Sequence, residues 1–319
     1  MIISASRRTD IPAVFSEWFF NRIKEGYVIV PNPMNTKQLS KISLDPSVVD
    51  CIVFWTKNPI PMMDRLDELE KYDNRFYFTF TLNAYGLDAD PNIPNKGNEL
   101  IPAFQQLSRT IGKERVCWRY DPIFISDNYD IRYHKKYFSV LCDKLASFTE
   151  KCTVSFVDLY EKTKRNTAPL NCRAPHPEEE RELLAYMVSV GKEHGIYIDT
   201  CCEKTDYSDL GVMKAHCIDK ERIERISGRK ISVKKDKNQR LECGCMSSID
   251  IGTYDTCSNG CLYCYANACH AFVQKNIAKH DPTSPLLIGN KDDYPKAKIT
   301  DREMKSLFEE KEENYLLDF

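Results

Sequence analysis

The chain has 319 residues, of which 42% are hydrophobic and 29% are charged, a size and composition ordinary for one (β/α) barrel with a sizeable core. The formal net charge of −2 argues against a globally basic nucleic-acid binder but leaves room for a local basic patch. No stretch approaches the roughly 20 consecutive apolar residues of a membrane span. The first residues also lack the basic-then-apolar pattern of a secretory signal, so we expect a cytoplasmic protein with no membrane partner.

Short apolar or β-branched runs alternate with longer amphipathic stretches through the first two-thirds of the chain. Eight runs are predicted strands: 2–6, 27–30, 51–55, 76–81, 116–120, 153–158, 196–200 and 248–252. Helix-like segments occupy 14–25, 61–71, 99–111, 132–149 and 177–194. This alternation predicts an α/β fold with a parallel sheet, closed into one (β/α) TIM-like barrel over 1–300. A doubly wound open sheet is the alternative, because periodicity does not separate the two.

Two segments depart from this rhythm. Residues 220–240 are rich in lysine and arginine, and we predict a short helix followed by a surface hairpin or lid. Residues 301–319 have an acidic amphipathic pattern, which predicts a helical tail packed on the barrel exterior.

Cysteine is the most unusual residue of the composition. Nine of the 14 cysteines lie between residues 201 and 269, and in a reducing compartment such crowding indicates metal or redox chemistry. Cys257, Cys261 and Cys264, in a loop spanning about 243–269, can each bind one iron of a [4Fe–4S] cluster and leave the fourth iron open. Structural zinc is the alternative, although zinc usually takes two widely separated Cys-x-x-Cys pairs.

A second cysteine group precedes that loop. Cys201, Cys217, Cys243 and Cys245 can hold an auxiliary [4Fe–4S] cluster, so we expect one cluster or two; zinc and no metal are the alternatives for this group. Successive strand residues point to opposite faces, so only one of Cys201 and Cys202 should aim at this site, and we choose Cys201.

The segment 257–267 reads Cys-Ser-Asn-Gly-Cys-Leu-Tyr-Cys-Tyr-Ala-Asn. Its spacing, with the aromatic Tyr263 before the third cysteine, resembles the hallmark of the radical S-adenosylmethionine (radical SAM) superfamily. Most of the chain also resembles an uncharacterised bacterial family, DUF1848. That second resemblance is carried by the segments 4–12, 54–59, 118–122 and 243–267.

The resemblance implies an enzyme whose cluster cleaves SAM to methionine and a 5′-deoxyadenosyl radical, which then acts on an unknown small-molecule substrate. It also implies an electron donor such as ferredoxin or flavodoxin. In typical radical SAM enzymes the motif follows the first barrel strand, whereas here it follows the last predicted strand. The barrel therefore looks circularly permuted, with the strand at 2–6 next in space.

In the superfamily that next strand usually ends in a Gly-Gly-Glu segment that holds the SAM amino group. The corresponding rim of this chain carries Ser6, Arg7, Arg8 and Asp10. We predict that Asp10 or Ser6 binds the methionine amino group and that Arg7 or Arg8 pairs with its carboxylate. Tyr263 is predicted to stack beside the adenine.

Polar residues at other strand ends converge on the same mouth in a barrel. We expect Lys57 to neutralise a phosphate or carboxylate, and Arg119 and Asp121 to form either a substrate clamp or a structural ion pair. Two other functions stay open at this stage. One is a non-catalytic iron–sulfur electron carrier or redox sensor; the other is a radical nucleic-acid repair or modification enzyme that uses the basic 220–240 stretch.

Overall fold

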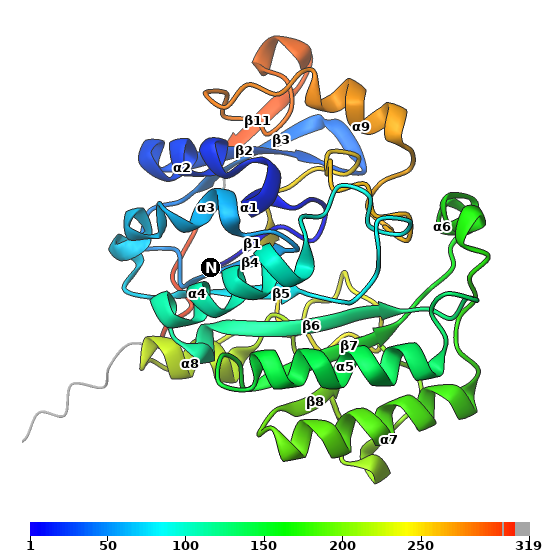
Figure 1. Ribbon diagram of the computed structural model, residues 1–319. Coiled ribbons are helices and arrows are strands. Elements are labelled where there is room, and N and C mark those ends of the chain that lie inside the picture. Colours follow the sequence, from blue (N-terminus) through cyan, green and yellow to red (C-terminus); the bar gives the residue numbers. More distant parts are fainter. Residues whose placement is uncertain (302, 310–319) are drawn as a thin grey trace, which may run out of the picture.

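The computed structural model describes residues 1–301 and 303–309. Its main layer is an eight-stranded sheet in the order β10-β1-β4-β5-β6-β7-β8-β9, and every neighbouring pair is parallel (Figure 1). The strands are β1 (Ile2–Ala5), β4 (Cys51–Thr56), β5 (Phe76–Thr81), β6 (Val116–Ile123), β7 (Lys151–Phe156), β8 (Tyr197–Thr200), β9 (Met213–Lys214) and β10 (Ile249–Asp250). The α/β class is confirmed. No backbone ladder joins the edge strands β9 and β10 among the described residues.

Several helices begin at residues that favour a helix N-terminus, such as a capping aspartate, a proline or acidic side chains in the first turn. Asp130 accepts a hydrogen bond from the Tyr133 backbone N–H at the start of α5, and α7 begins with Pro177 followed by three glutamates. The helices are α1 (Ile11–Val14), α2 (Ser16–Glu25), α3 (Ile60–Met63), α4 (Ile101–Ile111), α5 (Ile131–Leu145), α6 (Glu161–Thr167), α7 (Pro177–Glu193), α8 (Lys220–Ser227) and α9 (His270–Ile277). Among the described residues, none of them has the length and apolar content that crossing a bilayer requires.

A separate three-stranded sheet in the order β11-β3-β2 lies beside the main one (Figure 1). Its strands are β2 (Tyr27–Asn32), β3 (Asn35–Ser43) and β11 (Lys298–Asp301). The prediction that 27–30 is a strand of the main sheet was therefore wrong. Only two residues separate β2 from β3, so the pair folds as an antiparallel hairpin, whereas a parallel neighbour needs a long crossover. The short strand β9 takes the eighth place in the main sheet.

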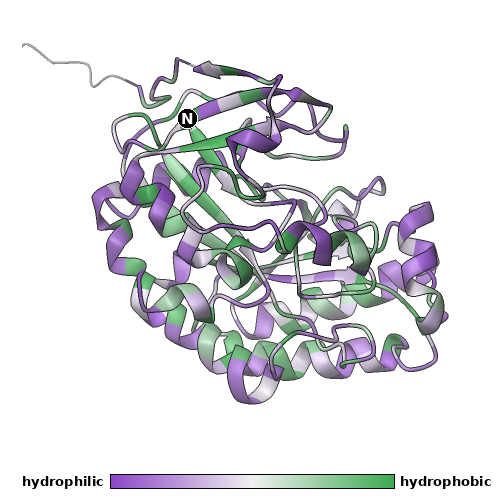
Figure 2. Cartoon of the chain, turned by 90° about the horizontal axis from the view of Figure 1, so that it is seen from above, coloured by the Kyte–Doolittle hydropathy of each residue, from purple (hydrophilic) through white to green (hydrophobic). Residues whose placement is uncertain are grey.

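The two faces of the main sheet have different partners. On one face, Phe54, Phe78 and Trp118 pack against the helices in the largest hydrophobic cluster. On the other face, Val53 and Tyr77 belong to a second hydrophobic cluster. The segment 215–246 supplies buried residues to the same cluster, among them Cys217, Ile218, Cys243 and Cys245. Figure 2 shows the hydrophobic colour concentrated on the central strands, while the surrounding helices carry both colours. The cysteine-rich segment therefore covers the sheet face that a barrel would enclose.

The segments outside the strand–helix rhythm also have defined positions. Helix α8 is followed by an antiparallel bridge between Lys235 and Met246, which matches the predicted helix and hairpin of the basic stretch. The described part of the predicted tail helix contains no helical turn. β11 ends at Asp301, and Phe308 forms a bridge with Ile231. The Asp50 carboxylate accepts a hydrogen bond from the Leu307 N–H and holds this segment in an extended conformation. Residues 302 and 310–319 of that prediction lie outside the described residues.

The end of β10 packs tightly against the turn that follows β1. A Cβ added at Gly252 would lie 2.6 Å from the Ser6 Cβ, with the Ser6 hydroxyl still nearer. We expect Gly252→Ala to lower the free energy of unfolding by about 1–3 kcal/mol, as overpacking does in cores. Urea unfolding measures the loss. Gly97→Ala is the matched control, because its added Cβ meets only one atom at an ordinary 3.5 Å. Equal stability of the two variants would contradict the close packing.

Candidate functional site

A loop directly after β10 carries Cys257, Cys261 and Cys264. Gly260 has a φ of 71°, so the chain turns sharply between the first two cysteines. Burial raises the pKa of all three thiols; for Cys261 the Asp90 carboxylate and the two other thiols raise the pKa further. The three sulfurs are thus near enough to influence one another, as ligands of a single cluster must be.

The loop is fastened to the segment that follows β5. The Leu262 N–H donates to the Ala89 carbonyl at 3.0 Å, and the Asn92 side chain donates to the Ser258 carbonyl at 2.8 Å. These contacts bring the buried carboxylate of Asp90 beside the cysteines.

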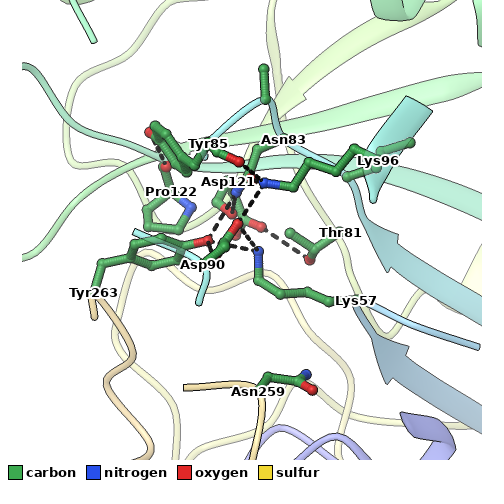
Figure 3. Close-up of polar contacts among 12 residues, drawn as sticks. Lys57, Thr81, Asn83, Tyr85, Asp90, Lys96, Asp121, Pro122, Asn259 and Tyr263 are labelled. Atoms are coloured by element: carbon green, nitrogen blue, oxygen red, sulfur yellow. Dashed lines mark hydrogen bonds and ion pairs between the residues drawn. The ribbon is translucent and has the colours of Figure 1, made fainter. Parts of the chain in front are cut away.

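Asp90 is the centre of a buried network of charged and polar groups (Figure 3). The Tyr263 hydroxyl donates to Asp90 Oδ1 at 2.6 Å, and Lys96 Nζ lies 2.7 Å from Asp90 Oδ2. Lys57 Nζ donates to the Tyr263 hydroxyl at 2.7 Å and lies 3.8 Å from Asp90 Oδ2. Two lysines thus surround the Asp90 carboxylate next to the three thiols.

The pKa shifts in this network follow its charges. Burial alone would raise the pKa of Asp90, but Lys57 and Lys96 outweigh it and the pKa is lowered. Burial alone would lower the pKa of Lys57, but Asp90 and the Cys261 thiol outweigh it and the pKa is raised. For Lys96 burial prevails and the pKa is lowered. Lys57 is therefore the firmly held cation of the site.

Tyr263 lies inside this network. Its ring is 5% exposed and packs against Tyr85 and Phe124, with centroids 5.4 and 5.7 Å away. Stacking on an adenine would require this ring to be uncovered first.

The turn after β1 is organised by Asp250, the last residue of β10. Its carboxylate accepts hydrogen bonds from the Ser6 hydroxyl and from the Arg7 backbone N–H, the latter at 2.8 Å. The guanidinium groups of Arg7 and Arg8 lie 3.9 and 4.0 Å from the same carboxylate and are partly exposed. The structure therefore brings Ser6, Arg7 and Arg8, three of the five predicted SAM-binding residues, together around Asp250, a residue with no predicted role.

Asp10 lies further along the same turn and is buried. One carboxylate oxygen caps α1 by accepting the Ala13 N–H at 3.0 Å, and the other accepts the Lys57 N–H at 2.8 Å and the Asn259 side chain at 2.9 Å. Burial raises its pKa against these hydrogen bonds. Asp10 thus joins the cysteine loop to the ends of β1 and β4, and both oxygens already have partners.

The second cysteine group is a ring of five thiols. The Cys217 and Cys201 sulfurs are 3.5 Å apart. Cys217, Cys243 and Cys245 lie in one buried cluster, and Cys201 and Cys202 pack against the same cluster. We call these five residues the thiol ring. The predicted group of Cys201, Cys217, Cys243 and Cys245 comes together, with Cys202 added.

Both Cys201 and Cys202 pack against this cluster, whereas only one of them was expected to aim at it. Alternation of side chains applies within a strand, and β8 ends at Thr200. Cys202 adopts a φ of 62°, a left-handed conformation that turns its side chain back toward the group.

Arg119 connects the thiol ring to the main sheet. One guanidinium nitrogen donates to the Cys217 sulfur at 2.7 Å, and another lies 2.6 Å from Asp121 Oδ2. Arg119 and Asp121 therefore form the ion pair that was one of the two predicted arrangements. Trp55 lies beside them, with the guanidiniums of Arg119 and Arg7 at 5.5 and 5.9 Å from its ring.

Glu203 is a half-buried acid that directly follows Cys202. Its carboxylate accepts the Phe156 N–H at 2.9 Å, and burial, followed by the charges of Glu180 and Asp158, raises its pKa from 4.5 to about 7. Because the folded state then binds more protons than the unfolded state between these values, stability falls as pH rises from 4.5 to about 7.

We expect Glu203→Gln to remove the fall in stability above pH 4.5, since the amide oxygen can still accept the Phe156 N–H and carries no charge. The variant should be about 3 kcal/mol more stable than the parent at pH 8 and equally stable near pH 4, because a tenfold change in a proton-binding constant corresponds to roughly 1.4 kcal/mol. Denaturant unfolding across this pH range measures both. The exposed Glu178→Gln is the control and should follow the parent. If the free energy of unfolding of Glu203→Gln and of the parent changed with pH in the same way, the prediction would be wrong.

Three functional candidates escaped the sequence analysis: Asp90, Lys96 and Asp250. Asp250 was visible only as part of a motif, and nothing local indicated what it contacts. Asp90 and Lys96 follow β5 in a long irregular stretch without periodicity, so only the folded chain reveals that they meet Lys57 and Tyr263.

Among the described residues, no three His, Cys, Asp or Glu side chains are arranged to hold one metal ion. Three half-buried thiols beside a lysine are a donor set that an iron–sulfur cluster can use.

The family model described as "Domain of unknown function (DUF1848)" matches residues 2–266. A search of curated proteins finds nothing that matches the chain. The matched range contains both cysteine groups and the Asp90 network.

Proposed function

This chain belongs to the DUF1848 family, and on that premise we propose that it is a radical SAM enzyme acting on a small-molecule substrate. The observation that carries the proposal is the position of the three-cysteine loop, which is fastened on one side to the β1 turn and on the other to the segment that carries the buried Asp90 network. A redox cluster with one open iron needs those surroundings, because a ligand must reach it and its negative charge must be balanced.

The proposed ligands of the cluster are Cys257, Cys261 and Cys264. When bound, a [4Fe–4S] cluster would supply the electron that cleaves the SAM sulfonium. Lys57 holds a positive charge beside the thiolates, and Tyr263 and Asp90 hold that lysine in place. We therefore assign Lys57 to charge compensation at the cluster.

The β1 turn is the proposed SAM site. Arg7 and Arg8 carry partly exposed guanidiniums and are the proposed partners of the methionine carboxylate. Ser6 and Asp10 are engaged with the protein, so we assign them to holding the turn. The buried oxygens of Thr9 and Asn267 lack hydrogen-bond partners among the described residues and suit the methionine amino group.

We further propose that the main sheet is an incompletely closed barrel, with the thiol ring filling the opening between β9 and β10. Arg119 and Asp121 then face the substrate side. The proposed location is the cytoplasm, where a ferredoxin or flavodoxin can reduce a cluster and thiols stay free.

Anaerobic reconstitution with iron and sulfide tests the proposal. The reduced protein should produce 5′-deoxyadenosine and methionine from SAM, and SAM should change the electron paramagnetic resonance spectrum of the cluster. A cluster without SAM cleavage would instead favour the electron carrier or redox sensor. Salt-dependent binding of DNA or RNA would favour the nucleic-acid enzyme. A colourless protein that takes up no iron would overturn the proposal.

A further inference from the structure

The thiol ring has no part in the proposed SAM chemistry, yet it gathers five cysteines from three separate segments. Cys201 and Cys202 follow β8, Cys217 follows β9, and Cys243 and Cys245 precede β10. Small buried cysteines are common as isolated core residues, but five gathered in one cluster are not explained by packing of apolar side chains.

The backbone is arranged to bring these sulfurs together. Gly244 lies between Cys243 and Cys245, and a Cβ there would meet His216 Nδ1 at 2.8 Å and the Ala215 carbonyl at 2.9 Å. The two cysteine-bearing segments therefore approach more closely than any residue other than glycine allows. Cys202 is a second position with an unusual backbone, because its φ of 62° is left-handed.

Hydrogen-bond donors point at two of the sulfurs. Arg119 donates to Cys217 at 2.7 Å, and the Ile218 backbone N–H donates to Cys245 at 3.4 Å. Such donors stabilise thiolates and tune the potential of iron–sulfur clusters. A buried guanidinium aimed at a sulfur also compensates the negative charge that metal-bound thiolates bring.

We infer that the thiol ring binds a second iron–sulfur cluster, a [4Fe–4S] centre distinct from the SAM-cleaving one. Soft thiolate donors select zinc, copper(I) or iron–sulfur clusters, and the five clustered cysteines supply more thiolates than the four ligands that one zinc ion takes. Cys201 and Cys217 are only 3.5 Å apart, too close for separate irons. We assign Cys202, Cys217, Cys243 and Cys245 as the ligands and Cys201 as the spare thiol.

The ring is connected to the first site by direct contacts. Arg119 joins Cys217 to Asp121, and the Asn83 amide lies 3.3 Å from the Asp121 carbonyl oxygen and 3.2 Å from the Tyr263 hydroxyl. The two centres would thus flank the Arg119–Asp121 pair.

Iron and sulfide counting on the full chain, reconstituted without oxygen, tests the inference. The parent should bind about eight irons, and Cys257→Ala/Cys261→Ala/Cys264→Ala and Cys217→Ser/Cys245→Ser should each bind about four. Cys201→Ser should keep the parent content, whereas Cys202→Ser should lose about four. Circular dichroism of each variant shows whether it folds, and the spectrum of the cluster that remains provides a second measurement in the same sample.

Two results would overturn the second centre: a triple variant with no iron, or zinc in place of iron at the ring. Loss of iron in Cys201→Ser with retention in Cys202→Ser would overturn the ligand assignment. The inference stands apart from the SAM proposal, because a parent that binds about eight irons and cleaves no SAM would end that proposal and support this one.

Discussion

Replacing Cys261 with alanine is expected to abolish both cluster binding at the first site and SAM cleavage. The loop supplies only three thiolates, and the two that remain cannot hold a cubane of four irons. About four irons per chain should be lost, and 5′-deoxyadenosine should fall to the background of a reaction without protein. Iron counting and chromatography of the reaction products measure these two effects.

Cys269→Ala is the matched control in the same segment. Cys269 lies at the N-terminal end of α9, and we expect it to pack rather than to bind iron. This variant should keep the parent's iron and its SAM cleavage. Unchanged cleavage in Cys261→Ala, or equal losses in the two variants, would contradict the assignment of the loop.

The second large effect concerns the stability of the sheet beneath the thiol ring. Lys151 and Asp199 form an ion pair at 2.6 Å on neighbouring strands, and each side chain is 4% exposed. Asp199 Oδ1 has no other partner among the described residues. Lys151→Met should therefore leave a buried, uncompensated carboxylate and lower the free energy of unfolding by about 3–5 kcal/mol.

The double variant Lys151→Met/Asp199→Leu separates this effect from a loss of packing. Removing both charges should recover most of the stability, because well-packed apolar residues commonly replace a buried ion pair at little cost. Urea unfolding of the parent and the three variants, including Asp199→Leu, closes the double-mutant cycle. A double variant as unstable as Lys151→Met would show that packing rather than charge governs the site.

Much of the main sheet could be predicted because its strands are buried on both faces. Strands such as β4, Cys51–Thr56, and β5, Phe76–Thr81, are continuous apolar runs between polar turns, which is the pattern of a parallel sheet. β3 was missed because its alternating Lys-Gln-Leu-Ser-Lys-Ile pattern is half-exposed and directly follows a tight turn. β9 was missed because two exposed residues carry no periodicity.

The candidate site divides in the same way. Cysteine spacing identified the loop ligands, since all three lie within eight residues of one another. The Asp90 network joins residues 57, 90, 96 and 263, and no local pattern records contacts over such separations. The strand rule does not apply at Cys202, because β8 ends at Thr200 and Cys202 has a left-handed backbone.

The position of Trp55 gives the chain an optical reporter. The other two tryptophans, Trp18 and Trp118, are fully buried in the helix-side core, whereas Trp55 is half-buried between Arg7 and Arg119. A light-absorbing group bound beside Arg7 or Arg119 should therefore quench the fluorescence of Trp55. Fluorescence titration of the metal-free protein with iron and sulfide would follow the proposed binding of the clusters. Trp55→Phe is the reference that lacks the Trp55 signal.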